Sequence, residues 1–375
     1  MAADFLPYGR QQVSEEDIAA VVEVLRSDWL TTGPKGREFE QALSAYVACA
    51  EAVAVANGTA ALHAACAAAG IGPGDEVIVP AITFAATANA VVYLGATPVF
   101  ADVDPATLLV DIASVESKMT HQTKAVIAVD YAGQPCDYDA LRQLAQQHNL
   151  VLIADASHSL GAAYKGRRCG SLADLTTFSF HPVKPLTTAE GGAVCTTNPD
   201  YAERMRRFRN HGISMEHQQR SDWRYEMTDL GFNYRLSDLQ SALGISQLKK
   251  IDEQIARRQH LAAAYRRHLA DSEAIRPLST LSAVDHGYHL FVVKVPASQR
   301  EEIFHALSRQ GIGVNVHYLP VYLHPFYRDR FNYGAGLCPV AEQVYEEIIS
   351  LPIFPAMTEE DVARVVTALQ RCCGE

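Results

Sequence analysis

Two reactive side chains follow apolar runs of the kind that form buried strands. Asp155 comes directly after VLIA, and Lys184 lies 29 residues later in the run FSFHPVKPLTTAEGG. A carboxylate at the carboxyl end of a parallel strand points into the ligand crevice of the sheet and can keep a pyridinium nitrogen protonated. A lysine held in an apolar loop can have a lowered pKa and form a Schiff base. The ordinary interpretations are an aspartate that caps the next segment and a solvated lysine.

A third segment has the features of a phosphate site. Residues 57–60, with the sequence NGTA, end the run AVAVA and open a helical stretch. Small residues at a helix N-terminus expose backbone N–H groups and a partial positive charge, and both suit a phosphate. Ser179, just before Lys184, adds a hydroxyl. Alternatively, Asn57 or Thr59 acts only as an N-cap.

Two further segments are less specific. His158, in the run DASH, either packs beside a bound ring, orients Asp155, or has a purely structural role. The run GFNYRL (231–236) precedes a long helical stretch. Its ordinary interpretation is a loop and a helix start, with Ser237 as a cap.

Seven short apolar runs alternate with helical stretches such as TAALHAACAAAG and DYDALRQLAQQHN. Apolar strands separated by helices predict an α/β fold with a mainly parallel sheet that is covered on both faces. Ligands of such a sheet bind at the carboxyl ends of its strands, where Asp155 and Lys184 are predicted to lie. The predicted strands are 52–56, 76–80, 97–103, 124–130, 151–157, 176–180 and 193–197.

The rest of the chain predicts a second, smaller domain. An extended arm (1–12) precedes a helix that follows Ser14, where SEED has the pattern of a capping box. One helix is predicted over about 236–270, long enough to bridge two domains. The strands HGYHLFVVKV and VNVHYLP and the helices REEIFHALSRQG and TEEDVARVVTALQRCC follow. The predicted division is a large domain at 13–250 and a small α+β domain at 251–375, which the arm joins.

The composition excludes several classes of protein. The 375 residues are 48% hydrophobic and 20% charged, which is typical of a globular protein rather than a disordered or fibrous one. A net charge of −11 argues against binding to nucleic acid or anionic lipid. The eight cysteines form no C-x-x-C pair, which favours reduced thiols in a cytoplasm over a metal site or disulfides. Residues 77–101 carry no charge, but their prolines and glycine predict strand, helix and strand rather than a membrane helix.

The combined segments resemble one family over nearly the whole chain. They look like the nucleotide-sugar aminotransferases of the DegT/DnrJ/EryC1/StrS type, which depend on pyridoxal 5'-phosphate (PLP). This resemblance implies fold type I of aspartate aminotransferase, with a seven-stranded sheet in the large domain, PLP as cofactor and no metal. The matching runs include LTTGP, VANGTAALHAA, PAITFAATANAV, VDYAGQP, DASHSLGA, FSFHPVK, TTAEGGAV, GFNYRLSDLQSALGISQLKK and VHYLPVY.

The resemblance also implies roles for individual residues. Lys184 matches the catalytic lysine that forms the Schiff base and moves a proton, and Asp155 matches the partner of the ring nitrogen. Phe84 matches the aromatic that stacks on the ring, although its ordinary interpretation is a core residue. The remaining cofactor contacts are Gly58, Thr59, Ala60 and Ser179 at the phosphate, His158 beside the ring, and Asn233 and Arg235 from a second subunit. Substrate contacts are expected from Tyr8, Asp28, Trp29, Leu30, Thr31, Thr32, His317 and Tyr318, with packing as the alternative for Tyr8 and Tyr318.

VDYAGQP, SFHPVKPLTTAEGG and VHYLPVY look most like one branch of the family. That branch aminates carbon 4 of a UDP-linked 4-keto-6-deoxy-N-acetylhexosamine on the pseudaminic acid pathway. The expected reaction moves the amino group of L-glutamate to this sugar and releases 2-oxoglutarate, in a homodimer with shared active sites. The alternatives are another nucleotide keto-sugar, with a carbon 3 ketone or a dTDP or GDP group, and a noncatalytic PLP-binding regulator. Lys184 favours transamination, because inactive relatives and dehydratases of the family replace this lysine.

Overall fold

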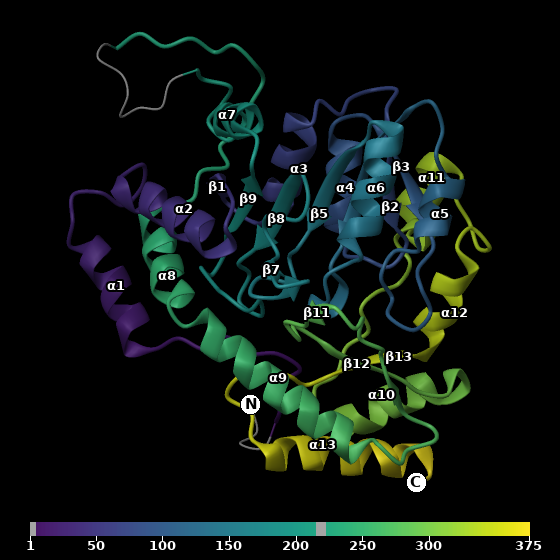
Figure 1. Cartoon of the computed structure of the whole chain (residues 1–375). Helices are drawn as coiled ribbons and strands as arrows, with labels where there is room; N and C mark the ends of the chain where they lie inside the picture. Colours follow the sequence, from purple (N-terminus) through teal and green to yellow (C-terminus); the bar gives the residue numbers. More distant parts are fainter. Residues whose placement is uncertain (1–4, 215–222) are drawn as a thin grey trace.

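The computed structural model describes residues 5–214 and 223–375, so residues 1–4 of the predicted arm lie outside the described residues. Its largest element is a seven-stranded sheet in the order β1-β9-β8-β5-β4-β2-β3 (Figure 1). Five strands, from β3 to β8 in this order, are parallel, whereas β9 is antiparallel to β8 and β1. This confirms the predicted mainly parallel sheet. Its strands are β1 (Glu51–Val55), β2 (Glu76–Pro80), β3 (Thr97–Ala101), β4 (Thr123–Val129), β5 (Val151–Asp155), β8 (Leu175–Ser179) and β9 (Gly192–Thr196).

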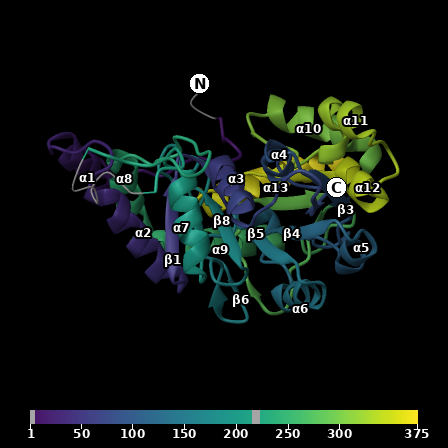
Figure 2. The same cartoon turned by 90° about the horizontal axis from the view of Figure 1, so that it is seen from above.

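Helices cover both faces of this sheet, which explains why its strands are apolar on both sides. Figure 2 shows α3 and α4 on one face and α5 and α6 on the other. The uncharged run 77–101 folds into β2, α4 and β3. In the described part of the chain, no helix has the length and apolar character needed to cross a membrane. The α-helices within residues 5–214 are α1 (Glu15–Leu25), α2 (Pro34–Val47), α3 (Gly58–Ala68), α4 (Ala85–Tyr93), α5 (Ile112–Ser117), α6 (Tyr138–His148) and α7 (Pro199–Phe208).

The prediction of one helix over 236–270 was wrong, because the chain forms two helices there. α8 (Asp238–Leu248) begins at the predicted cap Ser237, and α9 (Ile251–His268) follows a break at Lys250, whose φ and ψ are −111° and 1°. α8 packs against α1 and α2, whereas α9 packs against α13. The ammonium of Lys250 donates to Oδ1 of Asp17 on α1 at 2.8 Å. The break therefore lets each helix follow a different packing partner.

The C-terminal part contains a small antiparallel sheet and four helices, and the arm binds to it. Leu6 exchanges backbone hydrogen bonds with Gly311 and Gly313, and the carbonyl of Tyr8 accepts from the amide of Ile353. The prediction of a strand at VNVHYLP was wrong: only Asn315 forms an isolated bridge there. The elements are β10 (Arg276–Pro277), β12 (Phe291–Lys294), β13 (Ile348–Leu351), α10 (Arg300–Arg309), α11 (Pro325–Phe331), α12 (Pro339–Glu347) and α13 (Glu359–Cys373).

Residues after Asn315 leave the strand direction because their backbone is bound elsewhere. The hydroxyl of Tyr131 donates to the carbonyl of His317. A third, short sheet contains β11 (Val284–Asp285), β6 (Ala163–Tyr164) and β7 (Arg167–Arg168), in this order. Its strands β6 and β7 follow β5 along the chain. The division into 13–250 and 251–375 stays a prediction.

Candidate active site

Asp155 ends β5, which lies between β4 and β8 in the interior of the large sheet. Its side chain is buried, and each carboxylate oxygen has a hydrogen bond. Oδ1 accepts from the amide and the hydroxyl of Ser157, at 3.2 and 2.6 Å, and Oδ2 accepts from the hydroxyl of Thr87 at 2.8 Å. Asp155 therefore does cap the turn that follows it, as the alternative interpretation held, but one of its oxygens faces α4.

Lys184 lies in the turn after β8, where its amide donates to the carbonyl of His181 at 2.9 Å. In the described residues no hydrogen bond or ion pair reaches its amino group. Part of the residue is accessible to water, yet burial lowers the pKa of the Lys184 ammonium to about 8, against the opposing effect of the nearby Asp155 charge. Lys184 is therefore a partly buried lysine with a lowered pKa rather than a fully exposed one. A large fraction of this amine is neutral near pH 8.

Three buried histidine rings lie close to Lys184. The rings of His158 and His289 have centroids 4.4 Å apart, and Nε2 of His158 lies 3.4 Å from the hydroxyl of Tyr318. Burial and the Lys184 charge lower the pKa of the His158 and His289 imidazoles well below the usual range, and that of His317 to about 4. All three rings are therefore neutral near pH 7. Sequence reasoning missed His289, since a histidine within the strand-like run HGYHLFVV carries no local signal of a site.

Aromatic side chains line the open side of this cluster. Phe84 is 60% exposed at the start of α4, so its interpretation as a core residue is wrong. Its ring centroid lies 6.0 Å from that of Tyr318, and the ring of Tyr8 lies 5.7 Å from that of His317. Tyr8, His317 and Tyr318 thus lie in the same cluster as Lys184, as expected.

The start of α3 supplies free backbone donors, as a phosphate site needs. The side chain of Asn57 caps the helix by accepting from the amide of Ala60 at 2.8 Å, and its carbonyl accepts from Ala61. The amides of Gly58 and Thr59 keep no partner within the helix. A Cβ on Gly58 would lie 2.7 Å from Cβ of Ser179, so this glycine lets the end of β8 approach the start of α3. The N-cap and the phosphate-site interpretations of residues 57–60 are therefore compatible.

The structure does not bring every predicted site residue to Lys184 within one chain. The loop 28–32 contacts the start of α8, where the amide of Asp238 donates to the carbonyl of Leu30 at 3.1 Å. Asn233 is exposed, and its backbone forms a bridge with Asn210. The guanidinium of Arg235 donates to Oδ1 of Asn210 at 2.8 Å. The roles of the loop 28–32 in substrate binding, and of Asn233 and Arg235 in a second subunit's site, stay predictions.

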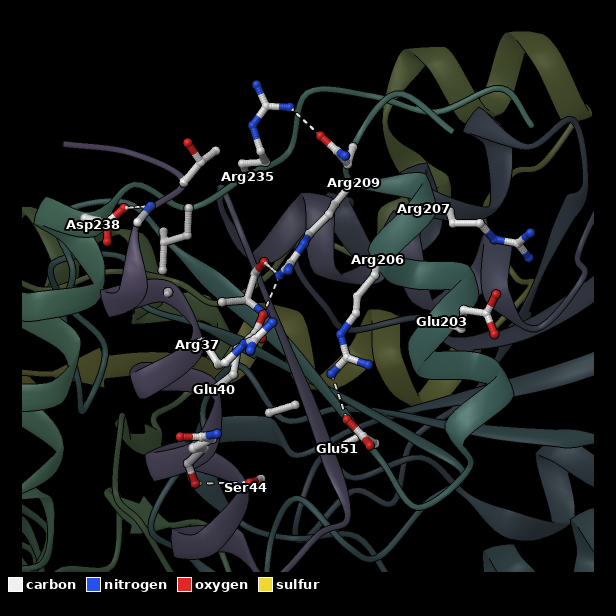
Figure 3. Close-up of a pocket in the computed structure, with 18 of the residues that line it drawn as sticks. Arg37, Glu40, Ser44, Glu51, Glu203, Arg206, Arg207, Arg209, Arg235 and Asp238 are labelled. Atoms are coloured by element: carbon white, nitrogen blue, oxygen red, sulfur yellow. Dashed lines mark hydrogen bonds and ion pairs between the residues drawn. The ribbon is translucent and has the colours of Figure 1, made fainter. Parts of the chain in front are cut away.

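A groove of about 660 Å³ lies away from Lys184, between α2, α7 and the edge strand β1 (Figure 3). Several arginines line it, but ion pairs within the groove already occupy two of them. Arg209 pairs with Glu40 and Arg206 pairs with Glu51. Glu40 accepts a hydrogen bond from the amide of Ala54 at 2.8 Å, and Arg209 donates to the carbonyl of Ala54 at 2.7 Å. The Glu40–Arg209 pair therefore satisfies the backbone of Ala54 at the open edge of β1, which is a structural role.

Replacing Glu40 with alanine should destabilise the fold by about 2–4 kcal/mol, because a largely buried guanidinium and the amide of Ala54 both lose their acceptor. The control is Glu38→Ala on the same helix. Glu38 pairs with Lys35 while its own side chain is 47% exposed, so its loss should cost about 0.5 kcal/mol or less. Urea unfolding measures both. Equal effects of the two substitutions would contradict this account of the β1 edge.

The profile of the DegT/DnrJ/EryC1/StrS aminotransferase family matches residues 11–370. The chain belongs to this family. The spore coat polysaccharide biosynthesis protein SpsC of Bacillus subtilis is 39% identical to this aminotransferase over 375 residues, which cover 98% of this chain and 96% of SpsC.

Two solved structures are similar over almost their full length. Helicobacter pylori PseC, an aminotransferase involved in the biosynthesis of pseudoaminic acid, superposes with a TM-score of 0.94 at 32% identity and 99% coverage of both chains. A Streptococcus pneumoniae protein, named as a sugar aminotransferase and solved in its PLP form, has a TM-score of 0.93 at 32% identity and the same coverage. The cofactor of the present aminotransferase is PLP.

The described residues fit this cofactor. Lys184 has an unpaired amino group, and Nδ1 of His158 is buried without a hydrogen-bond partner in the part of the chain that the structure describes. Asp155 is a buried carboxylate suited to a protonated ring nitrogen. The free amides at the start of α3 and the adjacent hydroxyl of Ser179 suit a phosphate. The aldehyde, the ring nitrogen and the phosphate of PLP thus each have a matching group in this aminotransferase.

The lowered pKa of Lys184 predicts how fast the apoenzyme takes up PLP. Only the neutral amine reacts with the cofactor's aldehyde, so the rate should rise with pH up to about 8 and level off above it. At pH 8 roughly half of the Lys184 amines are neutral, against about 0.3% for a lysine with the ordinary pKa of 10.5. Stopped-flow absorbance of the apoenzyme mixed with PLP measures this rate. A rate that still climbs through pH 10 would contradict the prediction.

Proposed function

We propose that this aminotransferase transfers the amino group of L-glutamate to carbon 4 of a UDP-linked 4-keto-6-deoxy-N-acetylhexosamine. The observation that carries the proposal is the partly neutral Lys184, whose amino group has no hydrogen bond within residues 5–214 and 223–375, beside the buried Asp155 at the carboxyl end of the large sheet. The similarity to PseC supports a keto-sugar of the pseudaminic acid type, and the similarity to SpsC supports polysaccharide precursors as substrates. A cytoplasmic site of action belongs to this proposal, and the eight free thiols support it.

PLP, when bound, supplies an electron sink for the carbon that loses a proton. Lys184 would hold the cofactor covalently and, as a neutral amine, would move the proton through Nζ. Asp155 would keep the ring nitrogen charged, and Phe84 would stack on the ring. The amides of Gly58 and Thr59, with Ser179, would bind the phosphate. Because His158 and His317 are neutral, they can donate or accept hydrogen bonds without repelling the Lys184 ammonium.

The reaction proceeds in two halves at the same site. Glutamate first leaves its amino group with the enzyme and departs as 2-oxoglutarate, and the keto-sugar then takes up the amino group. The substrate contacts from the same chain are Tyr8, His317 and Tyr318, whose rings lie together beside Lys184. The two half-reactions share Lys184 as the group that moves the proton.

A second subunit completes the site in this proposal. Asn233 is exposed, and Trp29 and Leu30 are 47% and 49% exposed, so these side chains are not committed to the core of their own chain. Large apolar side chains at Trp223, Met227 and Leu230 are 65–81% exposed on the same segment as Asn233. Such a patch favours association with a second copy of the chain. Asn233 and Arg235 then reach the partner's cofactor phosphate, and the loop 28–32 reaches its nucleotide sugar.

Mixing two inactive variants tests the shared site. Lys184→Ala and Asn233→Ala should each have low activity, but in a mixed dimer one of the two sites receives neither substitution. A one-to-one mixture after subunit exchange should regain about one quarter of the wild-type activity. The control is the same mixture before exchange, which should show only the sum of the separate activities. If exchange restores nothing while dimers form, Asn233 acts within its own chain.

A panel of nucleotide keto-sugars tests the substrate. Mass spectrometry of products from UDP-, dTDP- and GDP-linked sugars with carbon 3 or carbon 4 ketones should show amination of the UDP-linked 4-keto-6-deoxy-N-acetylhexosamine at the highest kcat/KM. Preference for another nucleotide or ketone position would overturn the substrate while leaving the transamination intact.

A further inference from the structure

Two threonine hydroxyls form a hydrogen-bonded chain that ends on the Asp155 carboxylate. Thr87 and Thr83 are both buried, with 0% and 2% of their surface exposed. Oγ1 of Thr87 lies 2.8 Å from Oδ2 of Asp155, and Oγ1 of Thr83 lies 2.7 Å from Oγ1 of Thr87. Both lie in the run PAITFAATANAV, in which the family resemblance assigns a role only to Phe84.

The direction of these hydrogen bonds follows from the chemistry of the groups. An ionised carboxylate only accepts, so the single hydroxyl proton of Thr87 goes to Asp155. Thr87 then accepts through its lone pairs, and Thr83 is the donor in the second bond. The result is a chain of two hydroxyls that ends on the carboxylate.

The helical turn of Thr87 begins directly after Phe84, which is expected to stack on the cofactor ring. Phe84 precedes α4, and the amide of Thr87 donates to the carbonyl of Phe84 at 3.1 Å. The first turn of α4 therefore places Phe84 at the open side of the site and the Thr87 hydroxyl against Asp155. A shift of this turn would move both groups together.

We propose that Thr87, with Thr83 behind it, is a positioning residue for Asp155, and that it keeps the shared proton on the cofactor's ring nitrogen. The inference rests on the proposed placement of that nitrogen at Asp155. Three donors converge on the carboxylate: the Thr87 hydroxyl and the amide and hydroxyl of Ser157. Hydrogen bonds to the ionised form stabilise it, so a carboxylate with these donors attracts the ring proton less strongly than a bare one. They also fix the orientation of the side chain.

The test is Thr87→Val, which removes the hydroxyl and keeps the shape. The control is Thr176→Val on β8: Thr176 is 1% exposed, and within the described residues its hydroxyl has no hydrogen bond. We expect Thr87→Val to weaken PLP binding by about 10-fold, and Thr176→Val to leave it unchanged. With PLP labelled with ¹⁵N at the ring, the nitrogen resonance should move towards the unprotonated value in Thr87→Val but not in Thr176→Val. Thr87→Ser, which keeps a hydroxyl, should restore the wild-type resonance.

Two further variants separate the possible failures. Thr83→Val keeps Thr87 and should shift the resonance in the same direction by a smaller amount, and it serves in place of Thr87→Val if that variant does not fold. If both variants behave like Thr176→Val while Asp155→Asn abolishes the protonated resonance, the role of the threonines is overturned. If Asp155→Asn also leaves the resonance unchanged, the placement of the ring nitrogen at Asp155 is wrong, and the inference falls with it.

Discussion

Lys184→Ala is expected to lower kcat by about 10⁴-fold or more, which is the largest effect that any single substitution in this chain should have. The reason is that one amine performs two tasks, covalent attachment of PLP and proton transfer at the reacting carbon, and alanine performs neither. The variant should also lack the visible absorption band of the attached cofactor. Steady-state kinetics with glutamate and the keto-sugar, together with an absorption spectrum, measure both effects.

Lys124→Ala is the matched control, since Lys124 is an exposed lysine on β4. It should keep the wild-type kcat and spectrum. Adding a small primary amine such as methylamine should restore part of the activity of Lys184→Ala, because the space left by the side chain admits an external base. Normal turnover by Lys184→Ala without added amine would show that another residue carries the chemistry.

Asp155→Asn should reduce kcat by about 10³-fold and weaken PLP binding. The amide has nearly the shape of the carboxylate but no charge, so it removes the electrostatic stabilisation of a protonated ring nitrogen. The hydrogen bonds from Thr87 and Ser157 end on oxygens in the wild type, and an amide nitrogen at either position would face a donor. Kinetics and equilibrium dialysis with PLP measure the two losses.

Asp102→Asn is the control for this substitution. Asp102 follows β3 at the same edge of the sheet, but its oxygens accept from the amides of Val340 and Ala341 at the start of α12. Its loss should reduce stability by about 1 kcal/mol and leave kcat near the wild-type value. Equal losses of kcat in the two variants would mean that the Asp155 effect comes from general damage to the sheet.

The sheet and the central pair could be predicted because their signals are local. Each strand is a short apolar run followed by polar or small residues, and this places Asp155 and Lys184 at strand ends without knowledge of the rest of the fold. Thr87 could not be predicted in this way. It lies 68 residues from its partner Asp155, and a threonine inside an apolar helix has no distinguishing pattern. The contact arises only when α4 packs against the end of β5.

The break between α8 and α9 was missed for a related reason. Lysine favours helices, so the residues at the break contain no stop signal. The contact that accompanies the break is made with Asp17, which lies 233 residues earlier and accepts a hydrogen bond from the Lys250 ammonium. The contacts of Asn233 and Arg235 could not be tested in one chain, since their proposed partners belong to a second chain.

The N-terminal arm has a consequence for how the protein is made. Leu6 is bound by the backbone at 311–313, Tyr8 by Ile353, and Gly9 lies against Val183, next to Lys184. The backbone partners of Leu6 and Tyr8 lie about 300 residues later in the chain and are therefore synthesised long after the arm. Closure of so long a loop is slow, so the arm takes its place late, after most of the sheet has formed. Lys184 is therefore synthesised well before residues 311–313 and 353, and the packing of the arm around Val183 is completed only after those residues are available.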